Sequence, residues 1–251
     1  MESPTAPAPP PPDLSVVMPA YNEEASIAAA IDDVLRLVAP HVGSIEIVVA
    51  DDGSRDRTGE ILAALAAREP RLKVVTRPNG GHGPALISAL GAARGRAVLL
   101  LDADREILLD GFPALWAAYQ ASGAVFGIRS GRRDGRLRKL ISRSLRAFLA
   151  LLFRRVPKDP NVPLKIVSRE AWAKAARASG PDNPLPSVLL ALHVGLSGPP
   201  AAEIPVAYRS REGSATTYRG WKLVKLCLMA GRTLIAFRFH PDVRALRAGG
   251  R

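Results

Sequence analysis

Four short apolar runs, each followed by polar residues, constrain the fold of this chain more than any other feature. The runs are LSVVM at residues 14–18, IEIVV at 45–49, LKVV at 72–75 and AVLLL at 97–101. Apolar residues recur with helical spacing between them, at residues 23–38, 58–68 and 85–93. Strands that alternate with helices predict right-handed βαβ units. The predicted fold class is therefore α/β, a mostly parallel central sheet with helices on both faces.

Three of the four predicted strands end in polar signatures, which read PAYNEE, ADDGS and DADRE along the chain. In open α/β sheets, ligands bind beyond the carboxyl ends of the strands. The three segments should therefore meet at one crevice. Asp102 and Asp104 would lie at the tip of a central strand, directly after the apolar run AVLLL.

The carboxylates of DADRE suit a hard divalent cation. Mg²⁺ takes one or two carboxylates and completes its shell with water and substrate phosphate oxygens, and Glu106 adds a third carboxylate here. The pattern of an EF-hand loop is absent, and four His and one Cys show no zinc-ligand spacing. An ordinary loop after a strand is the alternative interpretation of an isolated D-x-D.

Other familiar catalytic patterns are missing. The segment GGHGPA lacks the Lys-Ser/Thr of a P-loop, and the chain has neither G-x-G-x-x-G nor G-x-S-x-G. Dinucleotide redox chemistry and covalent acyl chemistry are both disfavoured.

Charge is distributed unevenly along the chain, whose net charge is +12. Residues 1–104 hold 9 Lys and Arg against 14 Asp and Glu, whereas residues 105–251 hold 26 against 9. Residues 129–177 alone contain 15 basic and 3 acidic side chains. Such a cluster of basic side chains indicates an anionic partner, namely phosphates, nucleic acid or an anionic membrane. The alternative is that these side chains only form a solvated surface. Aromatic residues are only 5% of the chain and no nucleic-acid-binding motif is present, so we expect no nucleic acid partner.

Two basic amphipathic stretches, 137–155 and 218–239, fit helices that lie on an anionic bilayer. Packing on the α/β core with basic outer faces is the alternative, and for 137–155 neither interpretation is favoured. In the second, Trp221, Phe237 and Phe239 lie among basic residues, which favours membrane contact over packing on the core. No apolar run reaches the roughly 18 residues of a membrane span. The single cysteine, Cys227, indicates a reducing compartment.

Seven segments together carry a resemblance. They are VVMPAYNEEASI, VVADDGSRDRTGEIL, RPNGGHGPALISALGAARG, VLLLDADRE, GIRSGRRDGRLRKLISRSLRAFLALL, KDPNVPLKIVSRE and EIPVAYRSREGSA, in this order. They resemble the family 2 glycosyltransferases of the GT-A (nucleotide-diphospho-sugar transferase) fold, especially the dolichyl- and polyprenyl-phosphate sugar synthases. The likeness covers residues 14–240. It implies a nucleotide-binding half at 14–104, an acceptor half at 105–217 and a C-terminal amphipathic helix at 218–240. We expect a disordered Pro/Ala-rich tail at 1–13 and a short tail at 241–251 to flank this domain.

The resemblance also implies roles for individual residues. The nucleotide pocket would be lined by Pro19, Tyr21 and Glu23, and the base or ribose met by Asp51 and Asp52. The donor diphosphate would lie at Asp102, Ala103 and Asp104, with Mg²⁺ or Mn²⁺ held by Asp102, Asp104 and Glu106. Acceptor or donor phosphate would be bound by Arg129, Arg138 and Arg211, which join Asp102 and Asp104 as the catalytic residues.

For several residues, the sequence allows more than one interpretation of their role. Glu106 and Ser187 stand where many relatives carry Gln and Asn, respectively. His82 could approach the diphosphate, although GGHG also reads as a tight turn. Asp159 could be a helper base, although an Asp before Pro more often belongs to a turn.

The predicted function is inverting, metal-dependent transfer of a sugar from a UDP- or GDP-sugar to a polyprenyl or dolichyl phosphate. An acceptor phosphate is already anionic, so the reaction requires positive charge rather than a strong base. The predicted location is cytoplasmic, peripheral at the inner face of the cell membrane, in cell-envelope glycan synthesis. The alternatives are transfer to a soluble or nascent glycan acceptor and a non-catalytic sugar-nucleotide-binding or anion-binding protein. A membrane-embedded protein that delivers the lipid is a further candidate partner.

Overall fold

The computed structural model describes residues 10–130, 146–153, 155–180, 183–209 and 221–248, except for the side chains of 221–227, 247 and 248. A single seven-stranded mixed sheet runs through the molecule in the order β3-β2-β1-β4-β6-β5-β7. Its strands are β1 (Leu14–Ala20), β2 (Ile45–Asp51), β3 (Leu72–Thr76), β4 (Ala97–Leu100), β5 (Ala124–Ser130), β6 (Lys165–Ser168) and β7 (Ala202–Ala207). The helices include α1 (Ile27–Leu37), α2 (Thr58–Ala66), α3 (His82–Ala92), α4 (Phe112–Ser122), α6 (Arg169–Ser179), α7 (Pro186–Ser197), α8 (Trp221–Phe239) and α9 (Pro241–Ala248).

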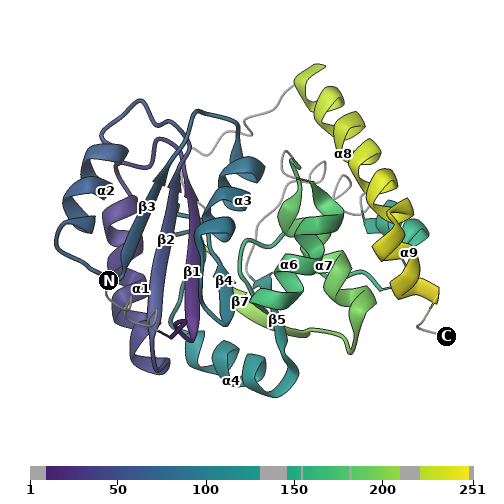
Figure 1. The fold of residues 1–251 in the computed structure, drawn as a ribbon, viewed down its shortest axis with the longest axis horizontal. Coiled ribbons are helices and arrows are strands. Elements are labelled where there is room, and N and C mark those ends of the chain that lie inside the picture. Colours follow the sequence, from purple (N-terminus) through teal and green to yellow (C-terminus); the bar gives the residue numbers. More distant parts are fainter. Residues whose placement is uncertain (1–9, 131–145, 154, 181–182, 210–220, 249–251) are drawn as a thin grey trace, which may run out of the picture.

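The first four strands confirm the predicted α/β layout. β3, β2, β1 and β4 are parallel neighbours, and every residue of β1 and β4 is buried. Helices α1, α2 and α3 flank these strands, while α6 to α9 gather at the other end of the sheet (Figure 1). The runs SVVM and AVLL lack alternation because both of their faces are covered.

Two helices begin elsewhere than the sequence pattern predicted. α1 starts at Ile27, four residues later than residue 23, because the preceding turn is held by contacts to the loop after β2. α3 starts at His82 rather than at Ala85, directly after Gly81, whose φ of +93° suits glycine.

The strand β6 runs antiparallel between β4 and β5. The first residue of β6 therefore lies at the end of the sheet that is formed by the carboxyl ends of β1, β2 and β4. This residue, Lys165, is the register partner of Leu100 on β4 and of Phe126 on β5. The antiparallel direction of β6 thus brings the basic residue Lys165 to the end of the sheet where the parallel strands have their carboxyl ends.

A second, smaller core joins the C-terminal helices. It contains Leu149 and Phe153 of the segment 146–153, Leu234 and Phe237 of α8, and Val243 of α9, all at most 2% exposed. The prediction of a tail at 241–251 was therefore wrong for Pro241–Ala248, which form α9 around Val243. None of the described helices is both long enough and apolar enough to cross a bilayer.

Candidate active site

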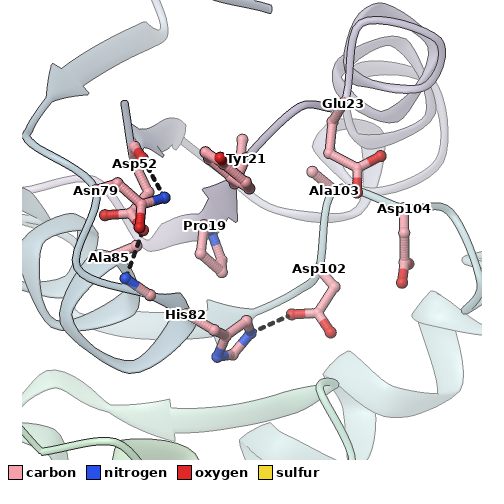
Figure 2. A pocket seen from close by; sticks show the side chains of 12 residues that line it. Pro19, Tyr21, Glu23, Asp52, Asn79, His82, Ala85, Asp102, Ala103 and Asp104 are labelled. Carbon is pink, nitrogen blue, oxygen red and sulfur yellow. Dashed lines mark hydrogen bonds and ion pairs between the residues drawn. The ribbon is translucent and has the colours of Figure 1, made fainter. Parts of the chain in front are cut away.

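A pocket of about 370 Å³ lies at the carboxyl ends of β1, β2 and β4. It is lined by Pro19, Ala20, Tyr21, Glu23, Asp52, Asn79, Gly81, His82, Ala85, Asp102, Ala103 and Asp104. Figure 2 shows that the side chains of Asp102 and Asp104 extend from one loop toward the same side of this pocket. Seven of the predicted site residues therefore share one cavity: Pro19, Tyr21, Glu23, Asp52, Asp102, Ala103 and Asp104.

The loops after β1 and β2 hold each other in place. The amide of Asn22 donates to Ser54 Oγ at 3.0 Å, and the amide of Arg55 donates to Asn22 Oδ1 at 2.8 Å. The amide of Glu23 donates to Thr58 Oγ1 at 2.8 Å. Asn22 has a φ of +55°, a left-handed conformation that Asn tolerates better than most residues. These contacts build the wall of the pocket on which Tyr21 and Glu23 lie.

Asp52, which lines the pocket, anchors the loop after β3. Its carboxylate pairs with Arg77 and accepts hydrogen bonds from the amides of Gly80, at 3.0 Å, and Gly81, at 2.7 Å. Asn79 Nδ2 donates to the Asp52 carbonyl at 3.0 Å. The side chain of Asp52 lines the pocket, but these contacts already use its carboxylate oxygens.

Asp51, the other predicted contact for the base or ribose, does not line the pocket. Its side chain is buried, and Oδ1 accepts a hydrogen bond from the amide of Ser54 at 3.0 Å. Asp51 therefore shapes the turn after β2.

Asp102 is connected to the loop after β3 through His82. The Nε2 atom of His82 lies 3.0 Å from Asp102 Oδ1, the dashed contact in Figure 2. Burial tends to raise the pKa of Asp102, but the hydrogen bond and charge of His82 and the charges of Lys165 and Arg129 lower it. Burial likewise opposes charge on His82, but the carboxylates of Asp102 and Asp104 raise the pKa of that imidazole. Asp102 is thus held as a carboxylate.

Asp104 is in a different electrostatic environment. Burial and the charge of Asp102 raise the pKa of Asp104 to about 6, with smaller contributions from the charges of Glu106 and Glu23. The amide of Glu106 donates to Asp104 Oδ1 at 2.9 Å and acts against this shift. Such crowding of negative charge is relieved by a bound cation.

The carboxylates of Asp102 and Asp104 suit a divalent metal ion whose remaining coordination positions are open to other ligands. Mg²⁺ and Mn²⁺ accept two carboxylates when water and phosphate oxygens complete the shell. Glu106, the predicted third ligand, accepts a hydrogen bond from the hydroxyl of Tyr208 at 2.5 Å. Within the described ranges, no group of three His, Cys, Asp or Glu side chains could hold a metal ion. Asp102 and Asp104 are therefore the ligands that this geometry favours.

Arg129 lies outside the pocket lining and forms an ion pair. Its Nε and Nη2 atoms donate to Asp159 Oδ2 and Oδ1 at 2.7 and 2.8 Å. Burial opposes the charge of Arg129, but the bond to Asp159 raises the pKa of the guanidinium. The other two predicted arginines, Arg138 and Arg211, lie outside the described residues.

Sequence reasoning missed two residues near the site and undervalued a third. Asn79 belongs to the segment RPNGG, which was treated only as a loop, and Lys165 is enclosed in the apolar run VPLKIV. His82 was weighed as a turn residue, but it reaches Asp102. The only signal for His82 was its position at the same sheet edge as DADRE.

Comparisons with known proteins agree with this arrangement. The sequence matches the family model described as glycosyl transferase family 2 over residues 15–168, more than half of the chain. An undecaprenyl-phosphate 4-deoxy-4-formamido-L-arabinose transferase from Pseudomonas paraeruginosa is 38% identical over 133 residues, 52% of this chain and 39% of that protein. Its namesake from Pectobacterium atrosepticum is 29% identical over 217 residues, 85% of this chain and 65% of that protein. The chain thus spans between about two fifths and two thirds of the length of these relatives.

A solved structure shares the fold. The crystal structure of glucosyl-3-phosphoglycerate synthase from Mycobacterium tuberculosis with uridine diphosphate matches 92% of this chain and 82% of that chain. The TM-score is 0.58 and the sequence identity is 26%.

Proposed function

Because this chain belongs to glycosyl transferase family 2, we propose that it transfers a sugar from a nucleotide-diphospho-sugar to a polyprenyl phosphate with inversion at the anomeric carbon. The observation that carries the proposal is the convergence of Asp102 and Asp104 in a pocket at the carboxyl ends of β1, β2 and β4. The similar transferases named above act, by their names, on undecaprenyl phosphate, which supports this class of acceptor.

The donor is proposed to occupy the pocket with its nucleotide against Pro19, Tyr21 and Glu23. Tyr21 is 42% exposed, so its ring is available for stacking on a base. The uridine diphosphate bound to the structurally similar synthase favours UDP as the leaving group, and GDP remains the second candidate.

Asp102 and Asp104 are the proposed ligands of Mg²⁺ or Mn²⁺. Bound there, the cation would neutralise the negative charge that develops on the leaving diphosphate. His82 orients Asp102 through the contact of 3.0 Å and limits its rotation. Glu106 stays a proposed additional ligand, which would exchange its contact with Tyr208 for the metal.

The transfer itself needs one bond to break and one to form. An oxygen of the acceptor phosphate attacks the anomeric carbon while the bond from that carbon to the diphosphate oxygen breaks. Because the attacking oxygen is already anionic, no proton has to be removed. Asp159, paired with Arg129, is therefore not required as a base.

Basic side chains are proposed to hold the acceptor phosphate. Arg129 lies at the end of β5, and Arg138 and Arg211 are the further candidates from the sequence. Two anions must approach each other in this reaction, so positive charge lowers the electrostatic cost of their encounter.

Contact with the membrane is proposed through the outer face of α8, here called the α8 face. It consists of Leu228, Met229, Ile235 and Phe239, which are 41–62% exposed. Arg232 lies exposed among them, and Leu151 of the segment 146–153 is 83% exposed. An apolar face with a basic residue suits a peripheral helix on an anionic bilayer, as expected for the inner face of the cell membrane.

Two aromatic residues that were expected to contact lipid are not counted in the α8 face. The prediction that Phe237 contacts lipid was wrong, because its side chain is 2% exposed and lies against Phe153 with ring centroids 6.1 Å apart. The side chain of Trp221 lies outside the described residues.

A transfer assay tests the proposal. Purified protein is incubated with each of several UDP- and GDP-sugars, with Mn²⁺, Mg²⁺ or EDTA, and with undecaprenyl phosphate in detergent. We expect metal-dependent formation of a glycosyl phospholipid and its loss in Asp104→Asn. Release of nucleotide only with 3-phosphoglycerate or an oligosaccharide as acceptor would instead establish a soluble acceptor. Binding of donor without turnover on any acceptor would favour a non-catalytic protein.

A further inference from the structure

Lys165 is a buried cation that lies outside the pocket lining and that the proposed reaction does not use. Its side chain is 0% exposed at the start of β6. Among the described residues, no carboxylate lies within ion-pair distance of its Nζ atom, which instead donates to two neutral oxygens. Burying an ammonium group without a counter-ion is costly, so such a residue near a cleft calls for a functional explanation.

The contacts of Lys165 join two separate elements. Nζ donates to Ser187 Oγ at 2.6 Å and to the backbone carbonyl of Val162. Ser187 is the second residue of α7 and is 8% exposed. Val162 closes a turn with Asp159, because its amide donates to the Asp159 carbonyl at 3.2 Å. Lys165 therefore ties the turn 159–162 to the start of α7.

That turn carries the partner of Arg129. Asp159 holds the Arg129 guanidinium with two hydrogen bonds, and both side chains are largely buried. The Nζ atom of Lys165 lies 5.9 Å from the ring centroid of Phe126, which is three residues before Arg129 on β5. Lys165 at the start of β6 is thus linked to the turn that carries Asp159 and lies beside the strand that carries Arg129.

The electrostatics agree with this geometry. Burial lowers the pKa of Lys165 to about 7, and the charge of Arg129 contributes to this lowering. The charges of Asp159 and Asp102 act in the opposite direction and raise this pKa. The charge of Lys165 in turn helps to keep the pKa of Asp102 low. Lys165 therefore interacts both with the Arg129–Asp159 pair and with the pocket.

We propose that Lys165 is a positioning residue, which fixes the turn 159–162 against α7 and so places Arg129 for the acceptor phosphate. This inference rests on the proposed function. It also gives Ser187 a role, as the hydrogen-bond acceptor that keeps the ammonium in place.

Steady-state kinetics of matched variants test the proposal. Lys165→Met removes the charge and both hydrogen bonds, Lys165→Arg keeps the charge, and Ser187→Ala removes one acceptor. Lys174→Met is the control, since Lys174 is a half-exposed lysine of α6 that pairs with Glu170. For Lys165→Met we expect the KM for undecaprenyl phosphate to rise about tenfold or more while the KM for the nucleotide-sugar changes less than about twofold. Ser187→Ala should change the acceptor KM in the same direction, and Lys165→Arg should restore part of the loss.

An equal rise in both KM values, or none in any variant, overturns the proposal. If Lys165→Met does not fold, Lys165→Arg and Ser187→Ala decide the outcome by the same comparison.

A second measurement separates this inference from the proposed function. The denaturant midpoints of Lys165→Met, Asp159→Asn and the double variant should be non-additive, because the two residues act through one turn. If wild-type protein transfers no sugar to undecaprenyl phosphate, the proposed function fails, and non-additive midpoints still support the placement of the turn by Lys165. Additive midpoints overturn that placement whether or not transfer is observed.

Discussion

The Nε2 atom of His82 and Oδ1 of Asp102 lie 3.0 Å apart, although His82 is the first residue of α3 and Asp102 lies in the loop after β4. The contact joins the start of α3 to the loop after β4 in the lining of the pocket (Figure 2). It gives one oxygen of the Asp102 carboxylate a fixed partner.

We expect His82→Ala to reduce turnover about 10–100-fold, the range seen when a partner that orients a metal ligand is removed. The melting temperature should change little, because the His82 side chain is 57% exposed. Activity measured across Mn²⁺ concentrations checks the prediction, with His41→Ala as the control on an exposed histidine. An unchanged metal requirement would contradict the orienting role.

Asp104→Ala is expected to abolish turnover without unfolding the protein. Asp104 stands in a group of carboxylates that raises its pKa to about 6, so its removal relieves repulsion rather than breaking a core contact. Rates and melting temperatures of Asp104→Ala are compared with those of Asp110→Ala, an exposed carboxylate six residues later. Substantial turnover at saturating donor would argue against the metal-binding role.

Arg129→Ala should raise the KM for the lipid phosphate more than that for the nucleotide-sugar. It should also lower the free energy of unfolding by about 1–3 kcal/mol, because Asp159 is left largely buried without its partner. The double variant Arg129→Ala/Asp159→Ala should be more stable than the sum of the single changes predicts. Chemical denaturation and initial rates provide the two readouts. A loss confined to donor affinity would show that Arg129 does not serve the acceptor.

His193 should make the protein sensitive to mild acid. Its side chain in α7 is 2% exposed, and neither ring nitrogen has a partner among the described residues. Burial lowers the pKa of His193 to about 4, so protons bind the unfolded chain more tightly. The free energy of unfolding should therefore fall as the pH drops from about 6.5 to 4, by up to about 1.4 kcal/mol per pH unit.

In His193→Leu this part of the pH dependence should disappear, and stability at neutral pH should rise because a buried polar group without a partner is gone. Urea denaturation at several pH values measures the free energy of unfolding of wild type and His193→Leu, with His240→Ala as the control. Parallel pH profiles of wild type and His193→Leu would contradict the assignment.

The α8 face should bring the protein to anionic vesicles. Binding should increase with the fraction of anionic lipid and weaken with salt, leaving a salt-resistant part that comes from apolar burial. Leu228→Ser/Phe239→Ser should reduce the salt-resistant part, and Arg232→Gln the salt-sensitive part. Co-sedimentation measures both, with Leu62→Val as a control inside the core. Equal binding to neutral and anionic vesicles would contradict electrostatic docking.

The sequence was informative where strands end at the pocket. The apolar runs predicted β1 to β4 because both of their faces are buried, and the polar residues after them predicted most of the pocket lining. The roles of Asp51 and Asp52 were harder to predict, since a carboxylate that binds a ligand and one that holds a loop look alike in a sequence.

The residues that were missed depend on contacts between distant segments. Lys165 starts a strand that runs antiparallel to its neighbours, so a rule about the carboxyl ends of strands could not place it at the same end of the sheet as the pocket. Phe237 looked like a lipid-facing aromatic residue because helical spacing alone does not tell which face of α8 meets Phe153.

The mutual support of the loops after β1 and β2 has a consequence for how such enzymes can be recombined. Besides the contacts of Asn22, the amide of Glu24 donates to Asp56 Oδ2 at 3.1 Å, and the amide of Arg57 donates to Glu24 Oε2 at 3.0 Å. We therefore expect each loop to depend on the other for its shape. A chimera that exchanges residues 21–26 with a relative should fold correctly only when residues 53–58 are inherited from the same parent. We thus expect the two segments to be exchangeable only together, although 26 residues separate them.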